Sequence, residues 1–187
     1  MTTIFAIDPG TTQSAWLRFD GARPQAFGIT ANDVLVRALR TGGLPDVVVI
    51  EEIRSYGMSV GQEVFDTVRW TGRFEEAACR VPVEFVGRKE IVVELCGSAR
   101  ASDSNVRTAL IDRFGGKDVA IGRKATPGPL YGITSDLWSA LAIAVTYPID
   151  LAAHAPARAA RHVWAEDWND PAMDVYDAGA QPREVRP

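Results

Sequence analysis

Ile4-Phe5-Ala6-Ile7-Asp8-Pro9-Gly10-Thr11-Thr12 is the stretch that decides the fold. Its four apolar residues, 4–7, predict a buried strand that ends at one carboxylate, Asp8. The Pro-Gly turn then sends the chain back into a second predicted strand at 14–19. An isolated charge at the end of a central strand is costly, so Asp8 must be hydrated, paired or bound to a cation.

Strands and helices follow this stretch in an order that defines the fold class. An Asp20-Gly21 turn and a short strand at 25–28 extend an antiparallel meander. A β-branched run at 47–50 and a segment at 83–86 predict two further strands, each preceded by a helix. The predicted helices cover 34–39, 59–79, 88–95, about 103–114 and 136–145. The sequence therefore predicts an α/β protein with one mixed five-stranded sheet flanked by helices.

Local signals refine the ends of these elements. Residues that favour helix N-caps precede three helices: Thr30 or Asn32, Ser102 or Asp103, and Ser135. Residues 115–133 are rich in glycine, which predicts a mobile loop. From about Pro148 the chain loses its periodicity and gains proline, alanine and mixed charge. We therefore expect a domain at 1–150 and a tail or arm at 151–187.

The composition limits the function classes. The net charge of -4 over 187 residues means that any DNA-binding surface must be a local one. The two cysteines form no CxxC spacing, which favours a reducing cytoplasm. No signal-like stretch and no run of about 18 apolar residues occurs, so neither export nor a membrane partner is expected.

Two further acids lie at the end of a predicted element, as Asp8 does: one at the end of a strand and one at the start of a helix. Glu51 ends the strand at 47–50, and Asp136 lies in the first turn of the last predicted helix. Neighbouring strand ends in one sheet bring two of these acids together, and a helix crossing that edge adds the third. Three carboxylates without His or Cys suit Mg²⁺ or Mn²⁺, and two such ions can drive phosphodiester hydrolysis. Taken alone, each acid also fits an ordinary turn, strand exit or helix start.

Three motifs, taken together, resemble a known family. They are Ile7-Asp8-Pro9-Gly10-Thr11-Thr12, Val49-Ile50-Glu51-Glu52 and Ser135-Asp136-Leu137-Trp138-Ser139-Ala140-Leu141-Ala142-Ile143-Ala144. In order and spacing they resemble the RuvC family of Holliday junction resolvases, within the RNase H-like superfamily, over residues 1 to about 147. The resemblance implies an RNase H-like sheet, a homodimer, Mg²⁺ or Mn²⁺, and paired nicks across a four-way DNA junction. The short, acidic form of the chain looks more like phage or prophage members than the bacterial housekeeping enzyme.

The resemblance also implies the roles of individual residues. The catalytic, metal-binding acids of the family fall on Asp8, Glu51 and Asp136. The last motif of the family has a second acid three residues after the first, where this chain has Ser139. Ser139 shares a helix face with Asp136 but is a poorer metal ligand. Glu52 or a water is therefore an alternative fourth contact.

Basic residues are the candidates for DNA phosphate contacts, because they cluster in sequence around the predicted site. They are Arg54, Arg69, Arg73, Arg88, Lys89, Arg100, Arg107, Arg123 and Lys124. Tyr56 follows Glu51 in an exposed-looking loop, where it is a candidate for stacking on an unpaired base. Each of these side chains also fits an ordinary surface charge or a partly buried loop tyrosine.

Two other functions stay open beside a Mg²⁺-dependent endodeoxyribonuclease acting on branched DNA. The turn at 8–12 also resembles the phosphate-binding turn of sugar kinases and actin-like ATPases, although those need a second such domain. A non-catalytic nucleic-acid-binding module on the same fold is the other alternative. Ser139 and the acidic pI favour it, and the three acids oppose it.

Overall fold

The computed structural model describes residues 2–43, 45–55, 57 and 59–147. These residues belong to one compact unit, Met1–Tyr147. The tail predicted at 151–187 and the candidate stacking residue Tyr56 lie outside the described residues, so both stay predictions. Among the helices that the structure describes, none has the length and apolar character needed to cross a bilayer.

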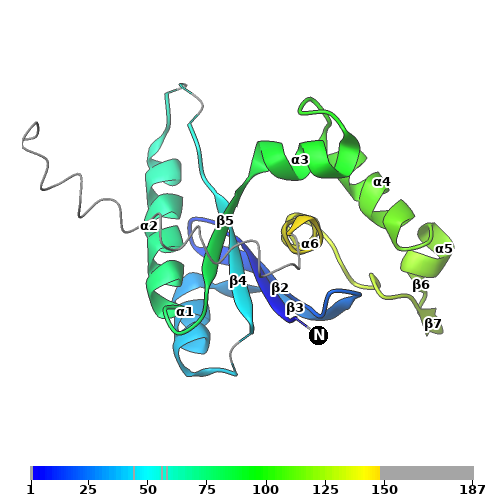
Figure 1. Ribbon diagram of the computed structural model, residues 1–187, viewed down its shortest axis with the longest axis horizontal. Helices are drawn as coiled ribbons and strands as arrows, with labels where there is room; N and C mark the ends of the chain where they lie inside the picture. Colours follow the sequence, from blue (N-terminus) through cyan, green and yellow to red (C-terminus); the bar gives the residue numbers. More distant parts are fainter. Residues whose placement is uncertain (1, 44, 56, 58, 148–187) are drawn as a thin grey trace, which may run out of the picture. The chain divides into compact units, whose positions relative to one another are not determined.

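A five-stranded mixed sheet forms the centre of this unit, in the order β3-β2-β1-β4-β5 (Figure 1). Its strands are β1 (Ile4–Asp8), β2 (Gln13–Phe19), β3 (Pro24–Ala31), β4 (Val47–Glu52) and β5 (Val83–Gly87). The first three pair antiparallel as a meander, and β4 runs parallel to both β1 and β5. The predicted fold class, a mixed five-stranded sheet flanked by helices, is confirmed.

The helices are α1 (Asn32–Thr41), α2 (Gln62–Ala77), α3 (Arg88–Cys96), α4 (Asp103–Arg113), α5 (Lys117–Ala120) and α6 (Leu137–Thr146). A two-stranded ribbon of β6 (Gly122–Arg123) and β7 (Thr126–Pro127) follows α5. The segment 115–133, predicted as a mobile loop, therefore contains a short helix and a two-stranded ribbon that the prediction missed. Its glycines permit the tight turns around these short elements, since Gly115, Gly116 and Gly122 all have positive φ. Ala120, Leu130 and Ile133 anchor the segment in the core.

The two faces of the sheet carry separate apolar cores because successive strand residues point to opposite faces. Ile7, Val48 and Ile50 pack on one side with residues of α1 and α2. Ala6 and Val49 pack on the other side with residues of α6, α3 and α4. Figure 1 shows α1 and α2 on one face and α6 on the other, with α3 and α4 beyond α6.

Helix α6 is apolar on nearly every side, which is typical of a helix enclosed by other elements. It contacts β1 and β2 on the sheet side, and α3 and α4 on the side away from the sheet. Leu141, Ala142 and Ile143, three consecutive residues, are all fully buried. This enclosure fixes the position of the helix that carries Ser139.

A buried polar network holds the turn that follows Asp8. The Gly10 N–H donates to Ser14 Oγ at 3.2 Å, and Ser14 Oγ donates to Asn32 Oδ1 at 2.7 Å. Asn32 Nδ2 closes the ring by donating to the Gly10 carbonyl at 2.9 Å. Gly10 admits no larger residue, because an added Cβ would lie 2.3 Å from the Gln13 carbonyl oxygen. The network therefore ties the start of α1 to the turn that positions Asp8.

This network corrects the predicted cap of the first helix. The N-cap residue of α1 is Ala31, and no side chain caps the helix. Asn32 lies one residue later and is 1% exposed, because its amide is used in the turn network. Thr30 accepts a hydrogen bond from Trp16 Nε1 at 2.8 Å instead of capping.

We expect Asn32→Ala to lower the free energy of unfolding by about 2–3 kcal/mol, because it leaves the buried Ser14 hydroxyl and the Gly10 carbonyl without their partner. Urea denaturation of the full chain measures the loss. The control is Asp33→Ala, whose exposed ion pair with Arg37 at 3.1 Å contributes at most about 0.5 kcal/mol. Equal losses in the two variants would show that the network contributes nothing beyond helix propensity.

Candidate active site

The pairing of β1 with β4 brings the first two acids together. The last pair in their parallel register is Ile7 with Ile50, so Asp8 and Glu51 are the next residues on two adjacent strands. Asp8 shares its face with Ala6, and Glu51 shares its face with Val49, because side chains alternate along a strand. Both acids therefore point to the side of the sheet that α6 covers.

Helix α6 supplies the other two predicted site residues. Asp136 is its N-cap residue and is exposed, while Ser139 is half-buried one turn later. The Ser139 hydroxyl lies near the Asp8 carboxylate, and hydrogen bonding to it lowers the pKa of Asp8. The prediction that Ser135 caps this helix was wrong, since α6 has no side-chain cap and Ser135 takes a left-handed φ of 45°. The Leu137 N–H instead donates to the Thr134 carbonyl at 3.0 Å.

The carboxylates of the site are not balanced by the positive charge around them, because the pKa values of both Asp8 and Glu51 are raised. Burial, helped by the charges of Glu51 and Asp136, raises the pKa of Asp8 from 3.8 to about 7. The Arg88 guanidinium and the Ser139 hydroxyl act in the opposite direction but do not cancel the rise. Burial also raises the pKa of Glu51, again against the charge of Arg88. The ionised form of the site is therefore costly unless a cation joins it.

The donor set fits a hard divalent cation in chemistry and in charge. Asp8, Glu51 and Asp136 offer carboxylate oxygens, and Ser139 adds a hydroxyl, which are ligands that Mg²⁺ and Mn²⁺ prefer. Within the described part of the chain, however, no three His, Cys, Asp or Glu side chains lie close enough together to enclose a metal ion. The acids thus share one electrostatic environment without forming a closed ligand cage.

Solved structures with a similar fold are known. A Thermus thermophilus RuvC in complex with a Holliday junction substrate is 22% identical and has a TM-score of 0.58, covering 78% of this chain and 92% of that chain. A second Thermus thermophilus RuvC structure is 20% identical with a TM-score of 0.54, covering 77% of this chain and 92% of its own. The fold is that of RuvC. No family model and no curated protein matches the sequence.

The RuvC fold of this chain brings two more charged residues to the acids, and sequence reasoning did not place either of them there. Arg88 was predicted only as a DNA contact, and Asp103 only as a possible helix cap. Arg88 forms an ion pair with Asp103, and the charge of Asp103 contributes to the raised pKa of Glu51. The cap of α4 is Ser102, which accepts a hydrogen bond from the Asn105 N–H at 3.4 Å. Only the parallel pairing of β4 with β5 could have signalled the position of Arg88.

Arg54 connects two elements at this edge of the sheet through its ion pairs. Its Nε donates to Glu52 Oε2 at 2.8 Å, and its Nη1 donates to Glu90 Oε1 at 2.9 Å. Glu90 also accepts a hydrogen bond from the Gly87 N–H, so Arg54 links the end of β4 to the start of α3. Glu52, the alternative fourth metal contact, is engaged in this network and follows Glu51, so it points to the opposite face of the sheet.

The remaining basic candidates are spread over several elements. Arg69 and Arg73 lie on α2, where Arg69 pairs with Asp66 at 3.4 Å and Arg73 stacks 4.5 Å from the Trp70 ring centroid. Helix α2 covers the sheet face opposite to the acids.

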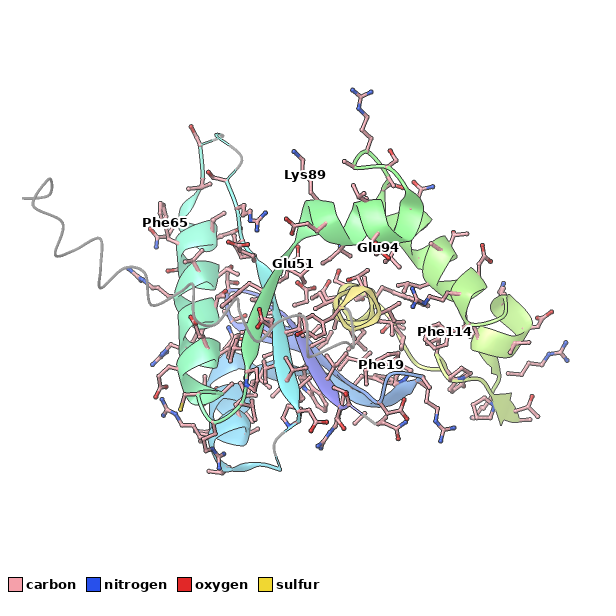
Figure 2. All side chains as sticks on the ribbon, in the orientation of Figure 1. Phe19, Glu51, Phe65, Lys89, Glu94 and Phe114 are labelled. Atoms are coloured by element: carbon pink, nitrogen blue, oxygen red, sulfur yellow. The ribbon has the colours of Figure 1, made fainter. Side chains whose placement is uncertain are left out.

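The other basic candidates lie on the α6 side of the sheet: Lys89 and Arg100 in or after α3, Arg107 on α4, and Arg123 and Lys124 in the β6–β7 ribbon. Arg107 stacks over Trp138, 5.0 Å from the ring centroid. Figure 2 shows Lys89 projecting from the start of α3, above Glu51 at the end of β4.

Proposed function

We propose that this chain is a divalent-metal-dependent endonuclease that nicks four-way or similarly branched DNA. The observation that carries the proposal is the adjacent position of Asp8 and Glu51 on the sheet face that receives Asp136 and Ser139. The likeness to a RuvC structure bound to a Holliday junction supports branched DNA as the substrate. Paired nicks need two copies of the site, so the proposal includes a homodimer.

The proposed roles follow from the donors. Asp8, Glu51 and Asp136 would hold Mg²⁺ or Mn²⁺, and the bound ion would supply an activated water and stabilise the leaving oxygen of a phosphodiester. The protein contributes two acids fixed on adjacent strands and a third at the start of a buried helix. Ser139 would stabilise the ionised Asp8 carboxylate by hydrogen bonding, which lowers the pKa of Asp8. The half-buried position of Asp8 and Glu51 limits water around these two carboxylates and strengthens electrostatic interactions there.

Cleavage of four matched substrates tests the proposal: a four-way junction, a flap, a linear duplex and an RNA–DNA hybrid, each with Mg²⁺, Mn²⁺ or EDTA. We expect symmetric nicks in the junction that need the metal and are absent in EDTA. Cleavage of only the flap or the hybrid would keep the metal-dependent site and reject the junction as substrate. Cleavage that persists in EDTA would reject the metal-dependent mechanism.

A non-catalytic junction-binding module is the second candidate. Two observations favour it: Ser139 stands in place of a second acid, and the described acids form no closed cage for a metal ion. Tight binding of the junction without cleavage in either Mg²⁺ or Mn²⁺ would support this function. Nicks in the same assay would exclude it.

We expect Ser139→Asp to lower the Mg²⁺ concentration for half-maximal cleavage by about tenfold, because a carboxylate is a better ligand than a hydroxyl. The same change should lower the melting temperature in EDTA, since it replaces a donor to Asp8 with a further negative charge. Ser139→Ala is the matched control, because it removes the donor without adding charge. An unchanged Mg²⁺ requirement in Ser139→Asp would show that position 139 lies outside the metal site.

A further inference from the structure

Arg88 occupies an unusual place for a cation. It is the first residue of α3 and directly follows β5, whose Gly87 lies opposite Glu52 in the parallel register with β4. The N-terminus of a helix carries a partial positive charge, which disfavours a cation in the first turn. Lys89 adds a second cation in the same turn. Violations of such local preferences in natural proteins concentrate at functional sites.

The guanidinium of Arg88 is electrostatically part of the acid site. Its charge lowers the pKa of both Asp8 and Glu51 against the rise caused by burial. The side chain is 30% exposed, so it is reached both by the acids and by a ligand from solvent. Arg88 is thus the cation that the protein itself supplies to an edge otherwise dominated by carboxylates.

The partner of Arg88 is much more exposed than Arg88 itself. Asp103 is the first residue of α4, and its side chain is 92% exposed in the ion pair. An ion pair with one fully solvated member contributes little stability and exchanges easily. Arg54 provides the contrast, because two carboxylates, Glu52 and Glu90, hold its guanidinium at the same edge.

We propose that Arg88 binds the DNA phosphate that lies at the acid site, and that Asp103 occupies the same guanidinium in the free protein. DNA binding then exchanges a carboxylate for a phosphodiester on Arg88. The planar guanidinium suits this exchange, because its donors match two oxygens of either group. The inference rests on the proposed function and goes further in two respects: it assigns Arg88, one of the basic candidates, to the phosphate at the acid site, and it names Asp103 as the competitor.

The test is the affinity of the full chain for a labelled four-way junction in EDTA over a series of salt concentrations. Removing one phosphate contact reduces the salt slope by about one, so Arg88→Met should weaken binding about tenfold with that smaller slope. Arg88→Lys keeps the charge and should retain the slope with weaker binding. Asp103→Asn should tighten binding about threefold or more, because it removes the competitor.

Asp112→Asn is the matched control for the change in net charge. Asp112 is exposed on the same helix as Asp103, about two and a half turns further along. If Asp103 competes for Arg88, Asp103→Asn tightens binding more than Asp112→Asn does, and this difference disappears in the Arg88→Met background. Equal gains in the two Asn variants, or an unchanged slope in Arg88→Met, would overturn the inference.

Two further measurements distinguish a failure of the Arg88 proposal from a failure of the proposed nuclease function. A melting curve shows whether Arg88→Met is folded, and if it is not, Arg88→Lys and the comparison of the two Asn variants decide. Wild-type protein that binds the junction through Arg88 but nicks no substrate would reject the nuclease and support the phosphate contact. Wild-type protein that binds neither junction nor duplex would overturn both.

Discussion

Asp8→Asn is expected to abolish DNA cleavage while making the metal-free protein more stable at neutral to alkaline pH. The loss of cleavage should be at least about 10³-fold, the scale seen when one member of a group of catalytic residues is removed. The gain arises because burial and the charges of Glu51 and Asp136 raise the pKa of Asp8 from 3.8 to about 7. A shift of this size corresponds to at most about 4 kcal/mol of destabilisation by the ionised form.

Urea denaturation in EDTA at about pH 8, together with junction cleavage in Mg²⁺, measures both effects. We expect the variant to gain about 2 kcal/mol in unfolding free energy, since a neutral amide removes the repulsion without reproducing every contact. Asp20→Asn is the control of opposite sign, because hydrogen bonds from the Arg23 and Ala22 N–H groups lower the pKa of Asp20. It should lose stability slightly and keep cleavage. Cleavage at the wild-type rate in Asp8→Asn would falsify the assignment of the active site.

The second large effect is that the free energy of unfolding depends on pH and on a bound metal ion. Both dependences arise from the Asp8 carboxylate. Between the unfolded value of 3.8 and the folded value of about 7, the native state holds the proton of Asp8 more tightly than the unfolded state. The contribution of Asp8 to stability therefore falls as the pH rises through this window and is constant above it. In EDTA, the unfolding free energy should lose about 2–3 kcal/mol from this source between about pH 5 and about pH 8.

A divalent cation should reverse this loss. At a Mg²⁺ concentration about 100 times its dissociation constant, binding to the native state adds about 2.7 kcal/mol at about pH 8. The difference between wild type and Asp8→Asn isolates the effect from other titrating groups, because the variant should show neither this pH dependence nor the gain with Mg²⁺. An identical response of the two proteins to pH and to Mg²⁺ would place the metal elsewhere.

The sheet could be predicted from the sequence because its strands carry strong local signals. The runs at 4–7 and 47–50 are apolar on both faces, and each ends at an acid. Strand alternation then determines that Asp8 and Glu51 share a face once β1 and β4 pair in parallel. The antiparallel meander makes β3 run in the same direction as β1, and α1 then connects β3 to β4 as a crossover, so β4 is parallel to β1.

The charged surroundings of the acids could not be predicted in the same way. Asp103 looked like an ordinary helix-start residue, and only the packing of α4 beside α3 brings it to Arg88. Asn32 has the residue type of a cap, yet burial directs its amide to the Gly10 turn. Both differences have one cause: a polar side chain is placed by long-range packing, whereas cap preferences are local.

The start of α6 bears on which ions this site can select. Asp8 and Glu51 are carried by paired strands, whereas Asp136 is exposed and makes no capping hydrogen bond that it would have to break in order to turn. Mg²⁺ demands near-ideal octahedral geometry, while larger cations accept longer and less regular coordination. Two rigid ligands and one adjustable ligand adapt to different ionic radii, and the entropy lost in ordering Asp136 weakens the binding of all of them. We therefore expect weak discrimination by size, with Ca²⁺ competing for the site that Mg²⁺ and Mn²⁺ use.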